Sequence, residues 1–147
     1  MLIYVDSSAL VKRALQEAES GQLVDALAGH VDSGARLFSS ALGTIETTRI
    51  IRQRLDDMDP FTVVDLIGAA LSGVIEYPIT DQVASIAARL GPFSLRSLDA
   101  IHLATATLVN ADLVCAYDQR LLLAASELGF RTISPGLAPG AGSLVAI

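Results

Sequence analysis

Four acidic side chains, spread over most of the chain, are the groups best suited to do chemistry together. Asp6 follows an apolar run near the start, Asp118 follows a second such run, and Glu46 and Asp99 lie early in segments with helical spacing. Carboxylates that lie close together without an equal number of basic side chains nearby repel one another. This repulsion raises their pKa values unless a cation lies between them. Oxygen ligands of this kind suit Mg²⁺ or Mn²⁺, whose chemistry on such a site is phosphodiester hydrolysis.

Each of these acids, taken alone, also has a simpler structural explanation. Asp99 could stabilise the start of a helix through the helix dipole, and Asp118 could cap the helix that follows it. Glu46 could pair with Arg49, three residues further along the same helix. Asp6 is harder to explain in this way, because a carboxylate that ends a buried strand needs backbone N–H groups, an arginine or a metal as its partner.

The elements that must position these acids alternate between strands and helices. Apolar runs predict five strands, at residues 2–6, 36–40, 74–79, 113–118 and 131–134. Periodicity predicts helices at 8–16, 20–28, 44–55, 61–71, 81–90, 98–110 and 119–128. Pro60 is expected to start the fourth of these helices, and Ser97 could cap the sixth.

This alternation predicts an α/β fold: a central, mainly parallel five-stranded sheet with helices on both faces, in three α/β/α layers. Sites in such folds form beyond the carboxyl ends of the strands. Asp6 and Asp118 end strands and Glu46 follows one, so these three acids are expected at one edge of the sheet. Asp99 starts the helix that enters a strand, which would place it at the opposite edge unless the loop before it crosses back. Periodicity leaves that question open.

Composition limits the class of protein further. The 147 residues suit one compact domain, and 52% hydrophobic residues suggest that a partner covers some apolar surface. The net charge of −6 argues against a protein that coats nucleic acid through its overall charge, although it permits local RNA binding. No bilayer-spanning run or signal peptide is apparent, and we expect a cytoplasmic protein without membrane association.

Four segments together resemble the PIN-domain ribonucleases, most closely the VapC-type toxins of prokaryotic toxin–antitoxin pairs. They are YVDSSALVK, TIETTRIIR, SLDAIHLATA and LVCAYDQRLL, and each carries one of the four acids in order. The resemblance runs from Leu2 to about Pro135. It divides the chain into a PIN domain at residues 1–135 and a Gly/Pro-rich C-terminal tail at residues 136–147.

The resemblance implies a PIN-like fold and a Mg²⁺- or Mn²⁺-dependent endoribonuclease. It also implies an RNA substrate, a homodimer and a cognate antitoxin protein. Carried over by residue, Asp6, Glu46, Asp99 and Asp118 would be catalytic. Asp6, Asp99 and Asp118 would hold the metal, and Ser7 would hydrogen-bond to one of these ligands or to a water molecule on the metal. It also implies that the helix containing Asp99 runs so that this acid reaches the others.

Two other enzyme classes with clustered acids require residues that this sequence lacks. A phosphate-receiver domain would need a lysine near the end of the last strand, whereas the only lysine is Lys12, and a haloacid-dehalogenase-type phosphatase would have a second Asp in place of Ser8. A non-catalytic PIN-fold binding or scaffold module remains the main alternative function. His102, one turn after Asp99, could approach the site, but a packed histidine is the preferred interpretation because oxygen-rich Mg²⁺ sites rarely include imidazole. Cys115 is expected to be a buried apolar side chain and Asp112 a turn residue. The arginines of residues 49–54 could contact RNA phosphates, antitoxin acids or only solvent.

Overall fold

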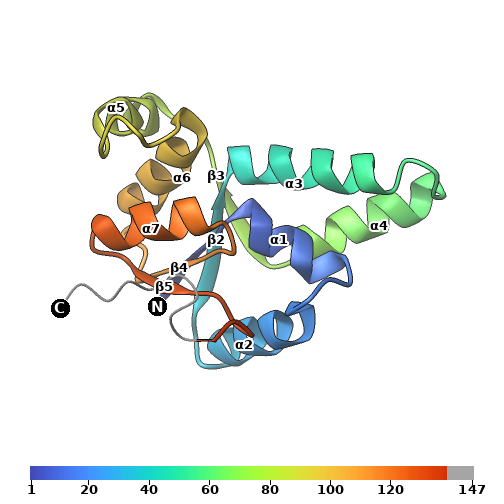
Figure 1. Ribbon diagram of the computed structural model, residues 1–147. Coiled ribbons are helices and arrows are strands. Elements are labelled where there is room, and N and C mark those ends of the chain that lie inside the picture. The colour runs from blue at the N-terminus through green and yellow to red at the C-terminus, as the bar shows by residue number, and fades with distance from the viewer. Residues whose placement is uncertain (139–147) are drawn as a thin grey trace.

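The computed structural model describes residues 1–138, which form one parallel sheet with helices on both of its faces (Figure 1). In chain order, the elements are β1 (Leu2–Val5), α1 (Ser7–Ala14), α2 (Ser20–Asp32), β2 (Arg36–Ser40), α3 (Ala41–Arg54), α4 (Pro60–Leu71), β3 (Val74–Tyr77), α5 (Asp81–Arg89), α6 (Ser97–Leu108), β4 (Leu113–Cys115), α7 (Gln119–Glu127) and β5 (Arg131–Ile133). The strand order is β3-β2-β1-β4-β5, and every neighbouring pair is parallel. The predicted five-stranded α/β architecture is therefore confirmed.

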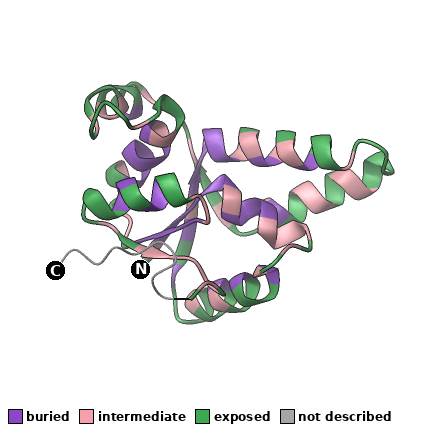
Figure 2. Ribbon diagram, viewed as in Figure 1, coloured by how far each residue is buried: buried purple, intermediate pink, exposed green. Residues whose placement is uncertain are grey.

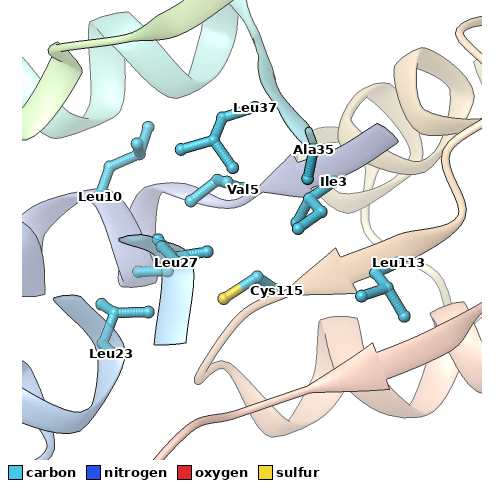
Figure 3. Packing of buried hydrophobic residues seen from close by; sticks show 10 residues of the cluster. Ile3, Val5, Leu10, Leu23, Leu27, Ala35, Leu37, Leu113 and Cys115 are labelled. Carbon is cyan, nitrogen blue, oxygen red and sulfur yellow. The ribbon is translucent and has the colours of Figure 1, made fainter. Parts of the chain in front are cut away.

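The alternating side chains of β1 divide the core into two layers. Ile3 and Val5 face the first layer, in which Leu10 of α1 and Leu23 and Leu27 of α2 pack against the sheet (Figure 3). On the opposite face, Tyr4 packs with side chains of α6 and α7, including Leu103 and Leu121. Because successive strand residues point to opposite sides, a short apolar strand buried on both faces serves both layers. The buried residues accordingly follow the sheet and the inner sides of the helices (Figure 2).

Local capping explains where the helices next to β1, β2 and β4 begin. The side chains of Asp6, Ser40 and Asp118 accept backbone N–H groups at the first turns of α1, α3 and α7. The prediction that Ser97 caps α6 is wrong: Arg96 occupies the cap position without a side-chain bond, and Ser97 is the first helical residue. α4 begins at Pro60 as predicted, because proline fits the first position of a helix.

Helices α3 and α4 extend away from the sheet as a pair (Figure 1). Arg13 of α1 holds the C-terminal end of α4 next to the sheet, where it donates hydrogen bonds to the carbonyl oxygens of Ala70 (2.7 Å) and Ser72 (2.8 Å). Only Ala70 of α4 is buried, although the helix is apolar along most of its length. The pair therefore presents an apolar surface that the core does not use.

The last described residues turn back toward α1 and α2. The hydroxyl of Tyr117 donates to the carbonyl oxygen of Pro135 at 2.7 Å, and Gly136 adopts a φ of 91° beside Glu19. Most of the predicted tail, residues 139–147, lies outside the described residues, and the domain boundary after Pro135 remains a prediction. Within residues 1–138, none of the helices combines the length and hydrophobicity that crossing a membrane requires.

Candidate metal and active site

Asp6 is held at the junction between β1 and α1. Its side chain is buried (4% exposed), and its Oδ2 atom accepts hydrogen bonds from the backbone N–H of Ser8 (3.2 Å) and from the Ser8 hydroxyl (2.7 Å). The Ser8 hydroxyl in turn accepts from the N–H of Tyr117, just beyond β4. These bonds fix one oxygen of Asp6 and leave Oδ1 directed toward His102, 3.4 Å from its Nε2 atom.

Glu46 of α3 and His102 of α6 meet next to Asp6. Nε2 of His102 lies 2.5 Å from Oε1 of Glu46, and its other ring nitrogen, Nδ1, lies 2.6 Å from the hydroxyl of Tyr4. Gly43 lets the first turn of α3 lie close against the end of β2, since a Cβ there would lie 2.3 Å from Oγ of Ser39. Glu46 therefore pairs with His102, and its expected alternative partner Arg49 is exposed on the same helix.

Asp99 lies in the first turn of α6, three residues before His102. Its Oδ2 atom is buried and has no hydrogen-bond partner among the described residues. Burial raises the pKa of Asp99, and the negative charge of Asp118 adds to this effect. A buried carboxylate oxygen without a partner costs free energy, and a bound cation would remove that cost.

Asp118 caps α7, three residues beyond the end of β4. Its Oδ1 atom accepts from the backbone N–H groups of Arg120 (2.9 Å) and Leu121 (3.3 Å). The capping role considered for Asp118 is thus present. It does not exclude a second role, because a carboxylate has a second oxygen.

All four acids line one pocket of about 400 Å³ at the carboxyl ends of β1 and β4. Ser7 lines it too, although the hydroxyl that contacts Asp6 belongs to Ser8. Lys12 and Arg54 line another part of the wall, and both pair with Glu17. The full lining is Asp6, Ser7, Ser8, Val11, Lys12, Glu17, Glu46, Ile50, Arg54, Asp99, His102, Tyr117 and Asp118.

The pocket fits a hard divalent cation. Asp6 and Glu46, together with His102, place ligand atoms within 4.8 Å of one another. Asp99 and Asp118 lie outside that tightest group but in the same pocket, and Asp99 carries the unpartnered oxygen. Oxygen ligands with room for water are typical of Mg²⁺ and Mn²⁺ sites.

The surrounding acids change the pKa of His102. Burial by itself lowers its pKa, but the hydrogen bond to Glu46 and the negative charges of Asp6, Glu46 and Asp99 outweigh burial and raise the pKa overall. His102 is buried (2% exposed), as expected of a packed histidine, yet it contacts two of the four acids. The spacing of residues 99 and 102, which share one face of a helix, is the sequence signal that allowed His102 to approach the site.

The other residues singled out in the sequence lie away from the pocket. Asp112 accepts a hydrogen bond from the N–H of Leu2 (2.7 Å) and so secures the start of β1. Cys115 is fully buried, and burial raises the pKa of its thiol to about 12, which makes it a poor nucleophile. Arg49 and Arg52 line a second hollow, between α3 and α4.

Comparison with protein families gives a match over most of the chain. The sequence model described as "PIN domain" matches residues 3–127. Two relatives from Mycobacterium tuberculosis are similar over nearly their whole lengths. Ribonuclease VapC47 is 36% identical over 137 residues, which cover 92% of this chain and 98% of the relative. Ribonuclease VapC46 is 39% identical over 136 residues, with coverages of 90% and 97%.

Solved structures with low sequence identity share the fold. Mycobacterium tuberculosis VapC20, described as a sarcin-ricin loop cleaving toxin, superposes with a TM-score of 0.66 at 18% identity, covering 93% of this chain and 99% of that one. A chain of VapBC2 from Rickettsia felis, solved bound to a DNA fragment from its promoter, gives a TM-score of 0.69 at 9% identity, covering 90% and 98%.

Proposed function

The chain belongs to the PIN-domain family, and on that premise we propose that it is a VapC-type toxin: an endoribonuclease that hydrolyses RNA with the help of a carboxylate-bound divalent ion. One observation carries the proposal. Acids that are up to 112 residues apart, on the junction after β1, on α3, on α6 and before α7, line one pocket. A scaffold module would gain nothing from this arrangement, because like charges gathered in one pocket destabilise a fold that binds no cation.

We assign the principal ion-binding role to Asp6 and Asp99. The Ser8 bonds hold Asp6 in one orientation, and the buried oxygen of Asp99 has no other partner within residues 1–138. The second oxygen of Asp118 is assigned to the same ion, and Glu46 to orienting water from the α3 side. Ser7 is assigned a supporting role in the pocket wall.

Mg²⁺ or Mn²⁺, when bound, would lower the pKa of a water molecule and neutralise charge on the scissile phosphate. Side chains of the pocket supply the proton acceptor and the positive charge for the RNA. Glu46, 27% exposed, is accessible from the pocket and can accept a proton there, while the bond from His102 holds its position. Lys12 and Arg54 add positive charge to the lining of the same pocket, where RNA phosphates would pass.

Incubation of the purified chain with RNA tests this proposal. We expect cleavage in Mg²⁺ or Mn²⁺, loss of cleavage in excess EDTA, and no cleavage of DNA of the same sequence. Because a water molecule is the proposed nucleophile, the products should lack the 2′,3′-cyclic phosphate ends that attack by the RNA 2′-hydroxyl leaves. Cleavage that survives EDTA and yields cyclic ends would contradict the mechanism. Absence of cleavage and of Mn²⁺ binding would favour the non-catalytic alternative.

We further propose that the apolar hollow between α3 and α4 receives the antitoxin. The hollow has a volume of about 940 Å³, and its walls combine apolar side chains of α4 with Arg49 and Arg52 of α3. Val64 is 65% exposed and neighbouring Phe61 is 81% exposed, so no other part of residues 1–138 covers this surface. A partner segment with an apolar face and acidic neighbours would match it.

Val64→Glu is expected to weaken antitoxin binding by about tenfold or more, since burial of one such side chain contributes about 1.5–3 kcal/mol. The measurement is isothermal titration calorimetry of each variant with the cognate antitoxin protein. Val24→Glu is the matched control, because Val24 is also exposed (44%) but lies on α2. RNA cleavage by both variants should equal that of the wild type. Equal antitoxin affinity of the two variants would exclude the hollow as the binding surface.

Two further expectations belong to the same proposal. An RNA substrate implies a cytoplasmic location, and the family resemblance implies a homodimer. Sedimentation velocity of the purified chain would measure the second directly.

A further inference from the structure

His102 occupies a position between the protein core and the acid pocket. On one side its Nδ1 atom lies 2.6 Å from the hydroxyl of fully buried Tyr4. On the other side its Nε2 atom lies 2.5 Å from Glu46 and 3.4 Å from Asp6. By distance alone, Nε2 could be a third metal ligand beside these two carboxylates.

The hydrogen bonds of Tyr4 argue against that assignment. The Tyr4 hydroxyl accepts a bond from the backbone N–H of Ser40 at 3.2 Å, which leaves its own proton free to be donated to Nδ1 of His102. A neutral imidazole that accepts at Nδ1 carries its proton on Nε2. A charged imidazolium carries protons on both nitrogens. In either form, Nε2 has a proton and no lone pair with which to bind a metal ion.

The contact with Glu46 independently indicates that Nε2 of His102 carries a proton. Without a proton on Nε2, two lone pairs would face each other across 2.5 Å, between the ring nitrogen and a carboxylate oxygen. With the proton there, the contact is a short charge-assisted hydrogen bond. Side chains around a metal site commonly depend on such hydrogen-bonding partners for their orientation.

We propose that His102 is a positioning residue, which donates from Nε2 to Glu46 and leaves the divalent ion to the carboxylates. This inference rests on the proposed function for its consequence in catalysis. Tyr4 acts through His102: its hydroxyl joins the ring to the backbone of Ser40 and so fixes the direction in which Nε2 points. The Tyr4 and His102 rings meet edge to face, with centroids 5.9 Å apart.

Nuclear magnetic resonance of the metal-free protein tests the proton position without any assay of activity. The chain has two histidines, so ¹⁵N-histidine labelling gives two ring systems, and His30→Gln identifies the signals of His102. We expect the neutral ring of His102 to carry its proton on Nε2. A neutral ring with its proton on Nδ1 would overturn the proposal.

Mn²⁺ binding to the same labelled protein tests the second half of the inference. Pulsed electron paramagnetic resonance should show no hyperfine coupling of the size that a directly bonded ¹⁵N gives. A directly bonded nitrogen would overturn the proposal. If the wild type neither binds Mn²⁺ nor cleaves RNA, the proposed function fails, whereas the proton position measured without metal still decides the hydrogen-bonding role.

Substitutions separate hydrogen bonding from packing. His102→Gln keeps an N–H near the position of Nε2, and we expect it to retain Mn²⁺ affinity and cleavage within several-fold of the wild type. His102→Leu keeps bulk but no donor, and should lower cleavage by about 10–100-fold while Mn²⁺ affinity, which is assigned to Asp6, Asp99 and Asp118, changes little. Tyr4→Phe should lower cleavage by a smaller factor, with Tyr77→Phe as the control on β3. Equal losses in His102→Gln and His102→Leu would show that donation to Glu46 is not what His102 contributes.

Discussion

Asp99→Asn is expected to abolish RNA cleavage while raising the midpoint of thermal unfolding of the metal-free protein. Loss of a carboxylate that holds the ion should remove several kcal/mol of transition-state stabilisation, a fall in rate on the order of a thousandfold or more. The gain in stability has a separate cause. Asparagine removes a charge that burial and Asp118 oppose in the folded chain.

The stability gain should depend on pH in a defined direction. Because the pKa of Asp99 is raised in the folded protein, ionisation of this carboxyl costs more free energy in the folded than in the unfolded state. The advantage of asparagine is therefore complete above the folded-state pKa. It disappears as the pH falls below the ordinary aspartate value of about 3.9, where both states are protonated.

The measurement pairs a cleavage assay with thermal unfolding by circular dichroism in EDTA. Asp6→Asn should also abolish cleavage, and it retains an oxygen to accept the Ser8 bonds that cap α1. Asp112→Asn is the matched control, since Asp112 lies outside the pocket and asparagine can still accept from Leu2. Cleavage by Asp99→Asn at the wild-type rate would refute the assignment of the site.

Mn²⁺ is expected to stabilise the wild-type protein and to have little effect on Asp99→Asn. A ligand that binds only the folded state, at one hundred times its dissociation constant, adds about 2.7 kcal/mol to the free energy of unfolding. The order of stability of the two proteins should therefore reverse. Without metal the variant is the more stable, and in saturating Mn²⁺ the wild type is.

Urea unfolding at a series of Mn²⁺ concentrations measures this reversal. Asp112→Asn should respond to Mn²⁺ as the wild type does, which controls for non-specific binding to an acidic protein. An equal response of wild type and Asp99→Asn would place the ion elsewhere on the surface. High salt should leave the response largely intact, because charges within a pocket are screened less than exposed ones.

The sequence was most informative where an element carries its own start signal. Pro60 marks the first residue of α4, and the run RLFSS coincides with β2. Prediction was weaker at the C-terminal end of β4, which stops at Cys115 instead of Asp118. Asp118 therefore does not end the strand as expected but caps the following helix. Apolar periodicity continues through Ala116 and Tyr117 because they pack on the sheet without extending it.

The candidate site was predictable as a set of acids but not as a set of contacts. That Asp99 reaches the pocket followed from the family resemblance, because periodicity does not say at which edge of the sheet α6 begins. The roles of Ser8 and His102 depend on contacts between residues far apart in the sequence: Tyr117 with Ser8, and Glu46 with His102. Such pairings are set by the packing of α3 and α6 against the sheet, which no local pattern encodes.

Crystallography with Mn²⁺ tests the central claim most directly, because the anomalous scattering of manganese identifies the ion independently of the protein atoms. The account predicts one strong anomalous peak in the pocket, within bonding distance of oxygens of both Asp6 and Asp99, and no such peak in crystals of Asp99→Asn. Fully occupied manganese elsewhere, with none between these two carboxylates, would contradict it.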